Sequence, residues 1–126
     1  MSFILLTSDL VETIHDAVLN PGELPGRARD KSLEGALGRI DNRIFYGLIA
    51  DVFDLAAAYA AAISQGHCFN DGNKRTAHQS MDVYLDLNRI ENTWEVEEVG
   101  QMIIRLAQGL IGEDEMAGWL RGHQSK

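Results

Sequence analysis

The sequence predicts an all-α fold of about six helices, with a loop between the two long central ones. Apolar residues recur at intervals of three and four along almost the whole chain, which is the spacing of helices with one buried face. The alanine-rich residues 48–65 are apolar on nearly every side and have the length of a buried helix. Residues 66–72 then interrupt the helical spacing, and it resumes at Asn73.

The first predicted helix precedes a loop that contains both prolines. Asp9, followed three residues later by Glu12, resembles a capping box and marks the start of the helix. Its inward face consists of Leu10, Ile14, Ala17 and Val18. The helix ends before Pro21, because proline disfavours helical geometry in the residue that precedes it. Residues 21–26 hold both prolines and two glycines and must form a loop.

The remaining helices follow this loop. The second runs from about residue 32 to residue 43. The third, residues 48–65, is the centre of the bundle, because its small side chains let neighbouring backbones approach closely. The fourth extends from Asn73 to Asn88, residues 90–94 are compatible with a brief strand, and two more helices complete the chain. The inward positions of the second, fourth, fifth and sixth helices are Leu33, Ala36, Leu37 and Ile40; Ala77, Met81, Tyr84 and Leu85; Val99, Met102, Ile103, Leu106 and Leu110; and Met116, Ala117 and Leu120.

The composition limits the class of protein and of partner. The 126 residues, 45% of them hydrophobic, suit one compact domain over residues 1–126 with a substantial core. A formal net charge of −8 repels nucleic acid and anionic membranes, whereas a partner with a basic segment suits such a surface. Cys68 is the only cysteine, which excludes an internal disulfide and a cysteine-rich zinc site. No basic stretch precedes the apolar N-terminal residues, so we expect a cytoplasmic protein without a signal peptide.

Residues 67–75, His-Cys-Phe-Asn-Asp-Gly-Asn-Lys-Arg, combine the groups that a phosphate site needs. The start of a helix exposes unpaired backbone N–H groups and the positive end of the helix dipole, so it binds phosphate readily. Lys74 and Arg75 add two cations there, although the dipole disfavours them and only a bound anion would offset that cost. Gly72 permits a close backbone approach, and Asn73 is a good N-cap.

Two further residues of this segment suit catalysis. Asp71 is a poor phosphate contact unless a metal bridges the two, and Mg²⁺ is commonly held by one or two carboxylates together with substrate phosphates. His67 titrates near neutrality and could take a proton from a substrate hydroxyl. Each residue taken alone also has a structural explanation, as a hydrogen-bonded histidine or a solvated Lys-Arg pair. The residues alone therefore predict a phosphate site without naming a reaction.

The same segment resembles the signature of the Fic/Doc family, His-x-Phe-x-Asp/Asn-Gly-Asn-x-Arg. Residues 14–16 (Ile-His-Asp), 24–26 (Leu-Pro-Gly) and 38–44 (Gly-Arg-Ile-Asp-Asn-Arg-Ile) resemble the death-on-curing (Doc) toxin branch of that family. The resemblance covers most of the chain and is weakest after Ile90. It implies a single Fic-like helical bundle, in agreement with the periodicity.

The resemblance also implies roles for individual residues. His67 would deprotonate the hydroxyl of a target protein, Asp71 would hold Mg²⁺, and Phe69 would anchor the loop in the core. Lys74 and Arg75 would join His67 in catalysis. The residues that would bind the phosphates of ATP are Asn70, Gly72, Asn73, Lys74 and Arg75.

Position 74 distinguishes two chemistries. Most Fic proteins have a glycine there and transfer AMP from ATP, whereas Lys74 matches Doc toxins, in which ATP lies in the inverted orientation and the γ-phosphate is transferred. The resemblance therefore implies a protein kinase whose substrate is a threonine of elongation factor Tu, so that translation stops. AMP transfer to a protein hydroxyl, a catalytically lapsed binding module and a toxin acting on another translation protein remain alternatives.

Inhibition is expected to come from a separate protein. Some Fic proteins carry an inhibitory Ser/Thr-x-x-x-Glu-Gly/Asn helix, but residues 8–13 and 93–98 each end such a pattern with the wrong residue. In Doc systems the C-terminal tail of an antitoxin folds into a helix against the toxin, and we expect such a partner here.

Several residues in or near the motif can be explained by structural roles. Cys68 beside His67 suggests a nucleophile–base pair, but adjacent side chains rarely face one another in that geometry. Gln65 stands where Doc toxins tend to be basic, so its role is open. We expect His15 to be a structural residue with a hydrogen bond inside the bundle, and His78 to lack partners for a metal.

Overall fold

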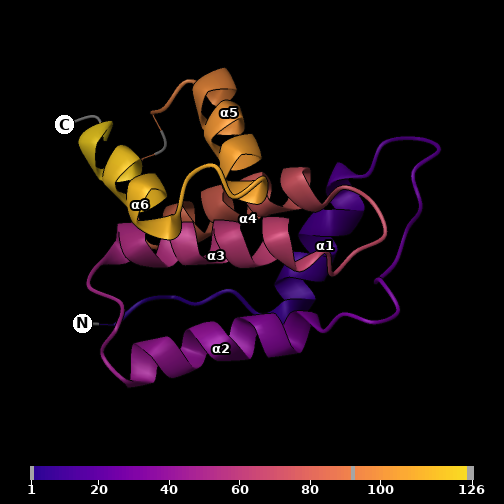
Figure 1. The fold of residues 1–126 in the computed structure, drawn as a ribbon, viewed down its shortest axis with the longest axis horizontal. Coiled ribbons are helices and arrows are strands. Elements are labelled where there is room, and N and C mark those ends of the chain that lie inside the picture. The colour runs from indigo at the N-terminus through magenta and orange to yellow at the C-terminus, as the bar shows by residue number, and fades with distance from the viewer. Residues whose placement is uncertain (1, 92, 125–126) are drawn as a thin grey trace.

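The computed structural model, which describes residues 2–91 and 93–124, is an all-helical bundle (Figure 1). Six α-helices are formed by the described residues: α1 (Ser8–Val18), α2 (Leu33–Phe45), α3 (Val52–Gly66), α4 (Asn73–Leu87), α5 (Val96–Ala107) and α6 (Glu113–Gly122). The β-structure in this part of the chain is limited to one isolated antiparallel bridge between Arg27 and Phe69. The predicted all-α class and the loop between two central helices are confirmed.

Helix α3 is the centre of the bundle. It packs against α2, α4, α5 and α6, and α1 packs against α4 and α2 (Figure 1). Its side chains are buried almost all round, including the alanines that let neighbouring helices approach. Between α3 and α4, the rings of Tyr59 and Tyr84 meet edge to face with centroids 5.2 Å apart. The core continues through Ile103 of α5 and Leu120 of α6, so all six helices share one hydrophobic cluster.

Three helix ends differ from the sequence prediction because of their caps. Helix α1 begins one residue before Asp9, since the side chain of Thr7 accepts the N–H of Leu10 and acts as the N-cap. Helix α3 begins at Val52 rather than at residue 48, because Asp51 caps it through the N–H groups of Phe53 and Asp54. The N-cap of α4 is Gly72, without a side-chain bond, and not Asn73.

Left-handed residues at helix ends explain two further differences. Arg89 has a φ of +63°, and Ile90 N donates to Leu85 O at 2.9 Å, which closes α4. Ile90 thus belongs to the helix end, and the described residues of 90–94 form no strand; residue 92 lies outside the described chain. Gly109 closes α5 in the same way and leaves Leu110 exposed. Ala17, expected on the inward face of α1, is also exposed.

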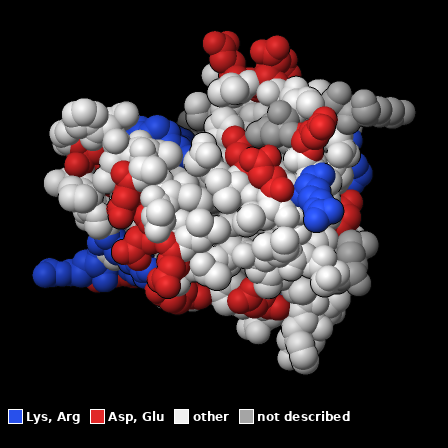
Figure 2. Space-filling view, turned by 180° about the vertical axis from the view of Figure 1, so that it is seen from behind, with Lys and Arg blue, Asp and Glu red and all other residues white. Residues whose placement is uncertain are grey.

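Acidic residues outnumber basic ones in the sequence, 19 to 11. Figure 2 shows acidic side chains scattered over the face opposite to the view of Figure 1, with most basic side chains near its edges. None of the helices formed by the described residues is both long and apolar enough to cross a membrane.

Candidate active site

The motif segment, defined here as residues 67–75, leaves α3 and enters α4 through two left-handed residues. His67 is the C-cap of α3 with a φ of +49°, and Gly72 is the N-cap of α4 with a φ of +78°. A non-glycine residue in this region costs roughly 1–3 kcal/mol; such residues cluster at active sites, and they also close helices, as Arg89 does here. A Cβ atom on Gly72 would lie 3.2 Å from Nη2 of Arg75, so glycine also leaves room for that guanidinium. The predicted conformational role of Gly72 is confirmed.

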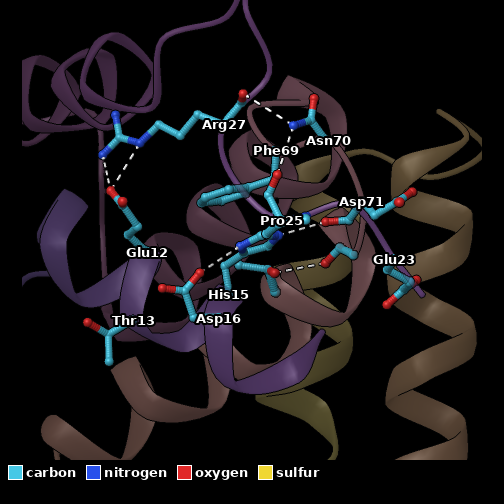
Figure 3. A network of polar contacts seen from close by, with 12 residues as sticks. Glu12, Thr13, His15, Asp16, Glu23, Pro25, Arg27, Phe69, Asn70 and Asp71 are labelled. Carbon is cyan, nitrogen blue, oxygen red and sulfur yellow. Dashed lines mark hydrogen bonds and ion pairs between the residues drawn. The ribbon is translucent and has the colours of Figure 1, made fainter. Parts of the chain in front are cut away.

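A buried stack holds the middle of this segment. The ring of Phe69 is 2% exposed and stacks on the ring of His15, with centroids 3.9 Å apart and planes 9° from parallel. Nε2 of His15 donates to the backbone oxygen of Asp71 at 2.7 Å (Figure 3). Because a carbonyl oxygen can only accept, the proton of His15 must be on Nε2. His15 is therefore the structural residue that the sequence predicts, and Phe69 is anchored in the core as expected.

The side chains of Asn70 and Asn73 form hydrogen bonds to backbone groups of the motif segment and of the loop before α2. The side chain of Asn73 accepts the N–H of Phe69 at 3.1 Å and donates to the oxygen of Phe69 at 2.9 Å. Asn70 Nδ2 donates to Pro25 O at 3.0 Å (Figure 3), and Asn70 N donates to Gly26 O at 3.1 Å. The amide groups of both asparagines thus shape the loop, and phosphate binding by either remains a prediction.

The loop between α1 and α2, residues 19–32, is clamped beside the motif segment. Arg27 pairs with Glu12 of α1 at 2.6 Å and with Glu34 of α2, and these carboxylates hold the pKa of the guanidinium above its usual range. Ala28 N donates to Cys68 O at 2.8 Å, next to the bridge between Arg27 and Phe69. The α1–α2 loop therefore lies along one side of the motif segment.

Cations and free N–H groups meet at the start of α4. The first helical hydrogen bond there runs from Thr76 N to Gly72 O, so the N–H groups of residues 73–75 precede it. Lys74 is exposed and, within the described residues, makes no ion pair or hydrogen bond through its side chain. Arg75 contacts Val18 O at 3.3 Å and forms an ion pair with Glu23 of the α1–α2 loop. The hydrogen bond from Arg75 lowers the pKa of Glu23, which therefore stays ionised.

Asp71 offers a single carboxylate to a metal ion. Its Oδ2 accepts the N–H of Leu24 at 2.8 Å, and the side chain is half-buried beside the start of α4. Over residues 2–91 and 93–124, no three histidine, cysteine or acidic side chains cluster as a metal site of their own. One carboxylate next to a phosphate site fits Mg²⁺, which takes its other ligands from phosphate oxygens and water.

The first two residues of the motif segment, His67 and Cys68, differ in solvent exposure. His67 is exposed, whereas Cys68 is 2% exposed and burial raises the pKa of its thiol. A buried protonated thiol is a poor nucleophile, which argues against a pair of Cys68 with His67. Gln65 donates to Leu106 O at 2.7 Å and ties the end of α3 to α5.

The structure thus brings the predicted site residues together on one loop and one helix start, and it adds residues that the sequence analysis missed. Glu23 and the N–H of Leu24 contact Arg75 and Asp71 from a different part of the chain. The prolines and glycines of residues 21–26 predict a loop with a restricted backbone. No local pattern predicts which part of the molecule that loop contacts.

Comparison with known proteins gives two matches. The Fic/DOC family matches residues 5–85, which include α1 to α3, the motif segment and most of α4. A protein of Escherichia phage P1 named protein kinase doc is 35% identical over 109 residues, 86% of each chain.

Proposed function

The chain belongs to the Fic/DOC family, and we propose that it is the toxin of a toxin–antitoxin pair that phosphorylates a threonine of elongation factor Tu with Mg-ATP. Membership of the family and the likeness to a protein kinase support a protein-modifying transferase. The target, the nucleotide and the metal are the finer part of the proposal, and they rest on the resemblance to the Doc branch.

The proposed transfer uses His67 as the base. The threonine oxygen bonds to the γ-phosphorus, the bond from that phosphorus to the β–γ bridging oxygen breaks, and ADP leaves. His67 accepts the hydroxyl proton, a role that requires the substrate hydroxyl to come within hydrogen-bond distance of the imidazole ring. The exposed position of His67, held by the left-handed end of α3, supports this assignment.

The phosphates would lie at the start of α4. Lys74, Arg75 and the N–H groups of the first turn would hold them, and their binding would draw Arg75 away from Glu23. Gly72 would leave the backbone accessible, and Asn70 and Asn73 would keep the loop in shape. Asp71 would hold Mg²⁺, which supplies charge neutralisation at the phosphates when bound.

The observation that carries the choice of a kinase is the free side chain of Lys74. It makes no ion pair or hydrogen bond within the described chain, and the resemblance to Fic proteins associates AMP transfer with a glycine at this position. A long cationic side chain there occupies space and attracts the polyphosphate, so it favours a different nucleotide orientation from that of a glycine. Binding energy is then used to bring the γ-phosphate to the target hydroxyl.

The setting of the reaction is part of the same proposal. We expect residues 1–126 to act as one domain in the cytoplasm, where ATP and elongation factor Tu meet, with restraint by the tail of an antitoxin. The shared core of all six helices supports the single domain.

Labelled ATP tests the proposal. Purified protein incubated with elongation factor Tu should transfer label from γ-labelled ATP in the presence of Mg²⁺ and none from α-labelled ATP. Label from α-labelled ATP would instead identify AMP transfer. Absence of label from both, while the protein remains toxic on expression, would favour a binding module.

A further inference from the structure

A hollow of about 390 Å³ lies between α2 and α3, which run side by side (Figure 1). Alanines of both helices line it, so a bound segment can come close to the two helix backbones. On the α3 side the lining ends with Gln65 and Gly66, directly before His67. Among the described residues of α4, none lines this hollow. It therefore begins beside the proposed base and is separate from the start of α4.

Three basic residues, here called the basic patch, lie at the α2 side of this hollow and in the loop before it: Arg29, Lys31 and Arg39. Arg39 lines the hollow, and its guanidinium is turned towards the start of α2, where Nη1 would lie 3.7 Å from a Cβ atom on Gly35. Lys31 directly precedes Ser32, the N-cap of α2. All three basic side chains are exposed, and within the described residues none forms an ion pair or a hydrogen bond.

The basic patch is close to the first residues of the motif segment. The residue before Arg29 donates its N–H to Cys68 O at 2.8 Å. Burial raises the pKa of the Cys68 thiol, and the positive charges of nearby basic residues, Arg39 and Lys31 among them, act against that rise. Asp30 lies between two members of the patch and forms no ion pair in the described chain, so the patch keeps a net positive charge. A positive surface thus flanks the beginning of the motif segment in an otherwise acidic chain.

We propose that the hollow and the basic patch dock an acidic segment of the protein that is phosphorylated, an inference that rests on the proposed function. The chain has a net charge of −8 and repels nucleic acid, so a protein segment with carboxylates is the anionic partner that fits this local positive surface. The phosphates of ATP do not occupy it, because their proposed cations lie at the other end of the motif segment, at the start of α4. An acidic segment held beside His67 brings a neighbouring hydroxyl to the base and selects it over other hydroxyls of the same protein.

Charge reversal at Arg39 tests the docking surface. Arg39→Glu changes an exposed side chain, so we expect the fold to be kept, and Arg39→Lys retains the positive charge. The matched control is Arg105→Glu in α5, which reverses the charge of another exposed side chain without an ion pair in the described chain. Thermal unfolding of each protein verifies the fold.

Steady-state phosphorylation of elongation factor Tu, at several salt concentrations, gives the readout. For Arg39→Glu we expect the KM for elongation factor Tu to rise by about tenfold, because an attraction becomes a repulsion, and we expect the rise to shrink as salt is added. The affinity for Mg-ATP, measured by isothermal titration, should stay at the wild-type value. Arg39→Lys and Arg105→Glu should keep the KM for elongation factor Tu within about threefold of the wild type.

The outcomes separate the docking surface from the proposed function. An unchanged KM for elongation factor Tu in a folded Arg39→Glu protein would overturn the docking surface and leave the kinase proposal standing. An equal rise in Arg105→Glu would show an effect of net charge alone, and weaker binding of Mg-ATP by Arg39→Glu would place Arg39 in the nucleotide site; either result would also overturn the docking surface. If the wild type transfers no phosphate to elongation factor Tu, the proposed function itself fails.

Discussion

The two sides of the motif segment differ in how the rest of the chain holds them. On the inner side, Phe69 is stacked on His15 and Asn73 is bonded twice to the backbone of Phe69, so this side is fixed by burial and hydrogen bonds. On the outer side, the side chains of His67 and Lys74 are exposed to solvent. Within this short segment, residues that hold the shape of the loop are thus distinct from the exposed residues that we propose for the chemistry. Substitutions on the inner side should affect folding, and those on the outer side should affect activity alone.

The largest expected effect comes from Phe69→Ala on the inner side. Removal of a buried phenyl ring costs about 3–5 kcal/mol, and the loss of the stack on His15 releases the motif loop. We expect a large drop in the free energy of unfolding in urea, together with loss of activity. Phe69→Leu, which keeps most of the apolar volume, is the control and should lose much less. A stable and active Phe69→Ala protein would contradict the division.

His67→Ala tests the outer side. General-base catalysis contributes about 10²- to 10⁴-fold, so phosphate transfer to elongation factor Tu should fall by that factor. The urea midpoint should change little, because His67 is exposed and histidine tolerates the left-handed conformation only somewhat better than alanine. Activity within a few-fold of wild type would remove His67 from the mechanism.

Lys74→Gly introduces the glycine that the resemblance to Fic proteins associates with AMP transfer. Loss of a charge that stabilises the transferring phosphate should lower kinase activity by about a hundredfold, and the space created could admit AMP transfer. Parallel assays with γ- and α-labelled ATP measure both reactions. Lys74→Arg keeps the charge and should retain more kinase activity than glycine. Full kinase activity in Lys74→Gly would show that this side chain does not orient ATP.

Glu23→Gln removes the charge that pairs with Arg75, next to the motif segment. In the proposed site Arg75 leaves Glu23 to bind phosphate, so removal of the negative charge of Glu23 should lower the KM for ATP. Because the pair is partly exposed, we expect a change of at most about fivefold. Steady-state kinetics at several salt concentrations measure it. A raised KM would show instead that Glu23 positions Arg75 for the substrate.

The smallest effect is expected at Cys68, which is buried although its neighbour His67 is exposed. Because burial raises the pKa of its thiol, little thiolate is present at neutral pH. Iodoacetamide should leave Cys68 unmodified in the native protein and should modify it in denaturant, as measured by mass spectrometry. Rapid modification of the native protein would indicate that the inner side of the segment opens readily.

Local patterns explain why the helices and the motif segment could be predicted from the sequence. Periodicity predicted the helices of the described chain, because most of them bury one face and α3 is apolar almost all round. The cluster of groups at residues 67–75 predicted the candidate site. Helix ends were predicted less well. Thr7 caps α1 in place of Asp9, and Arg89 closes α4 in a left-handed conformation that a sequence pattern rarely indicates for arginine.

Contacts over long separations account for what the sequence did not predict. Arg75 pairs with Glu23, and Asp71 accepts the N–H of Leu24, although more than 40 residues separate each pair. These contacts depend on how the α1–α2 loop folds back over α4, which follows from tertiary packing and not from local spacing.

The central claim, phosphate transfer by this segment, is tested most directly by the intact mass of elongation factor Tu after incubation with the protein and Mg-ATP. We predict an increase of about 80 Da, the mass of one phosphate group, which is absent when His67→Ala replaces the wild type. An increase of about 329 Da would identify AMP transfer and contradict the role assigned to Lys74.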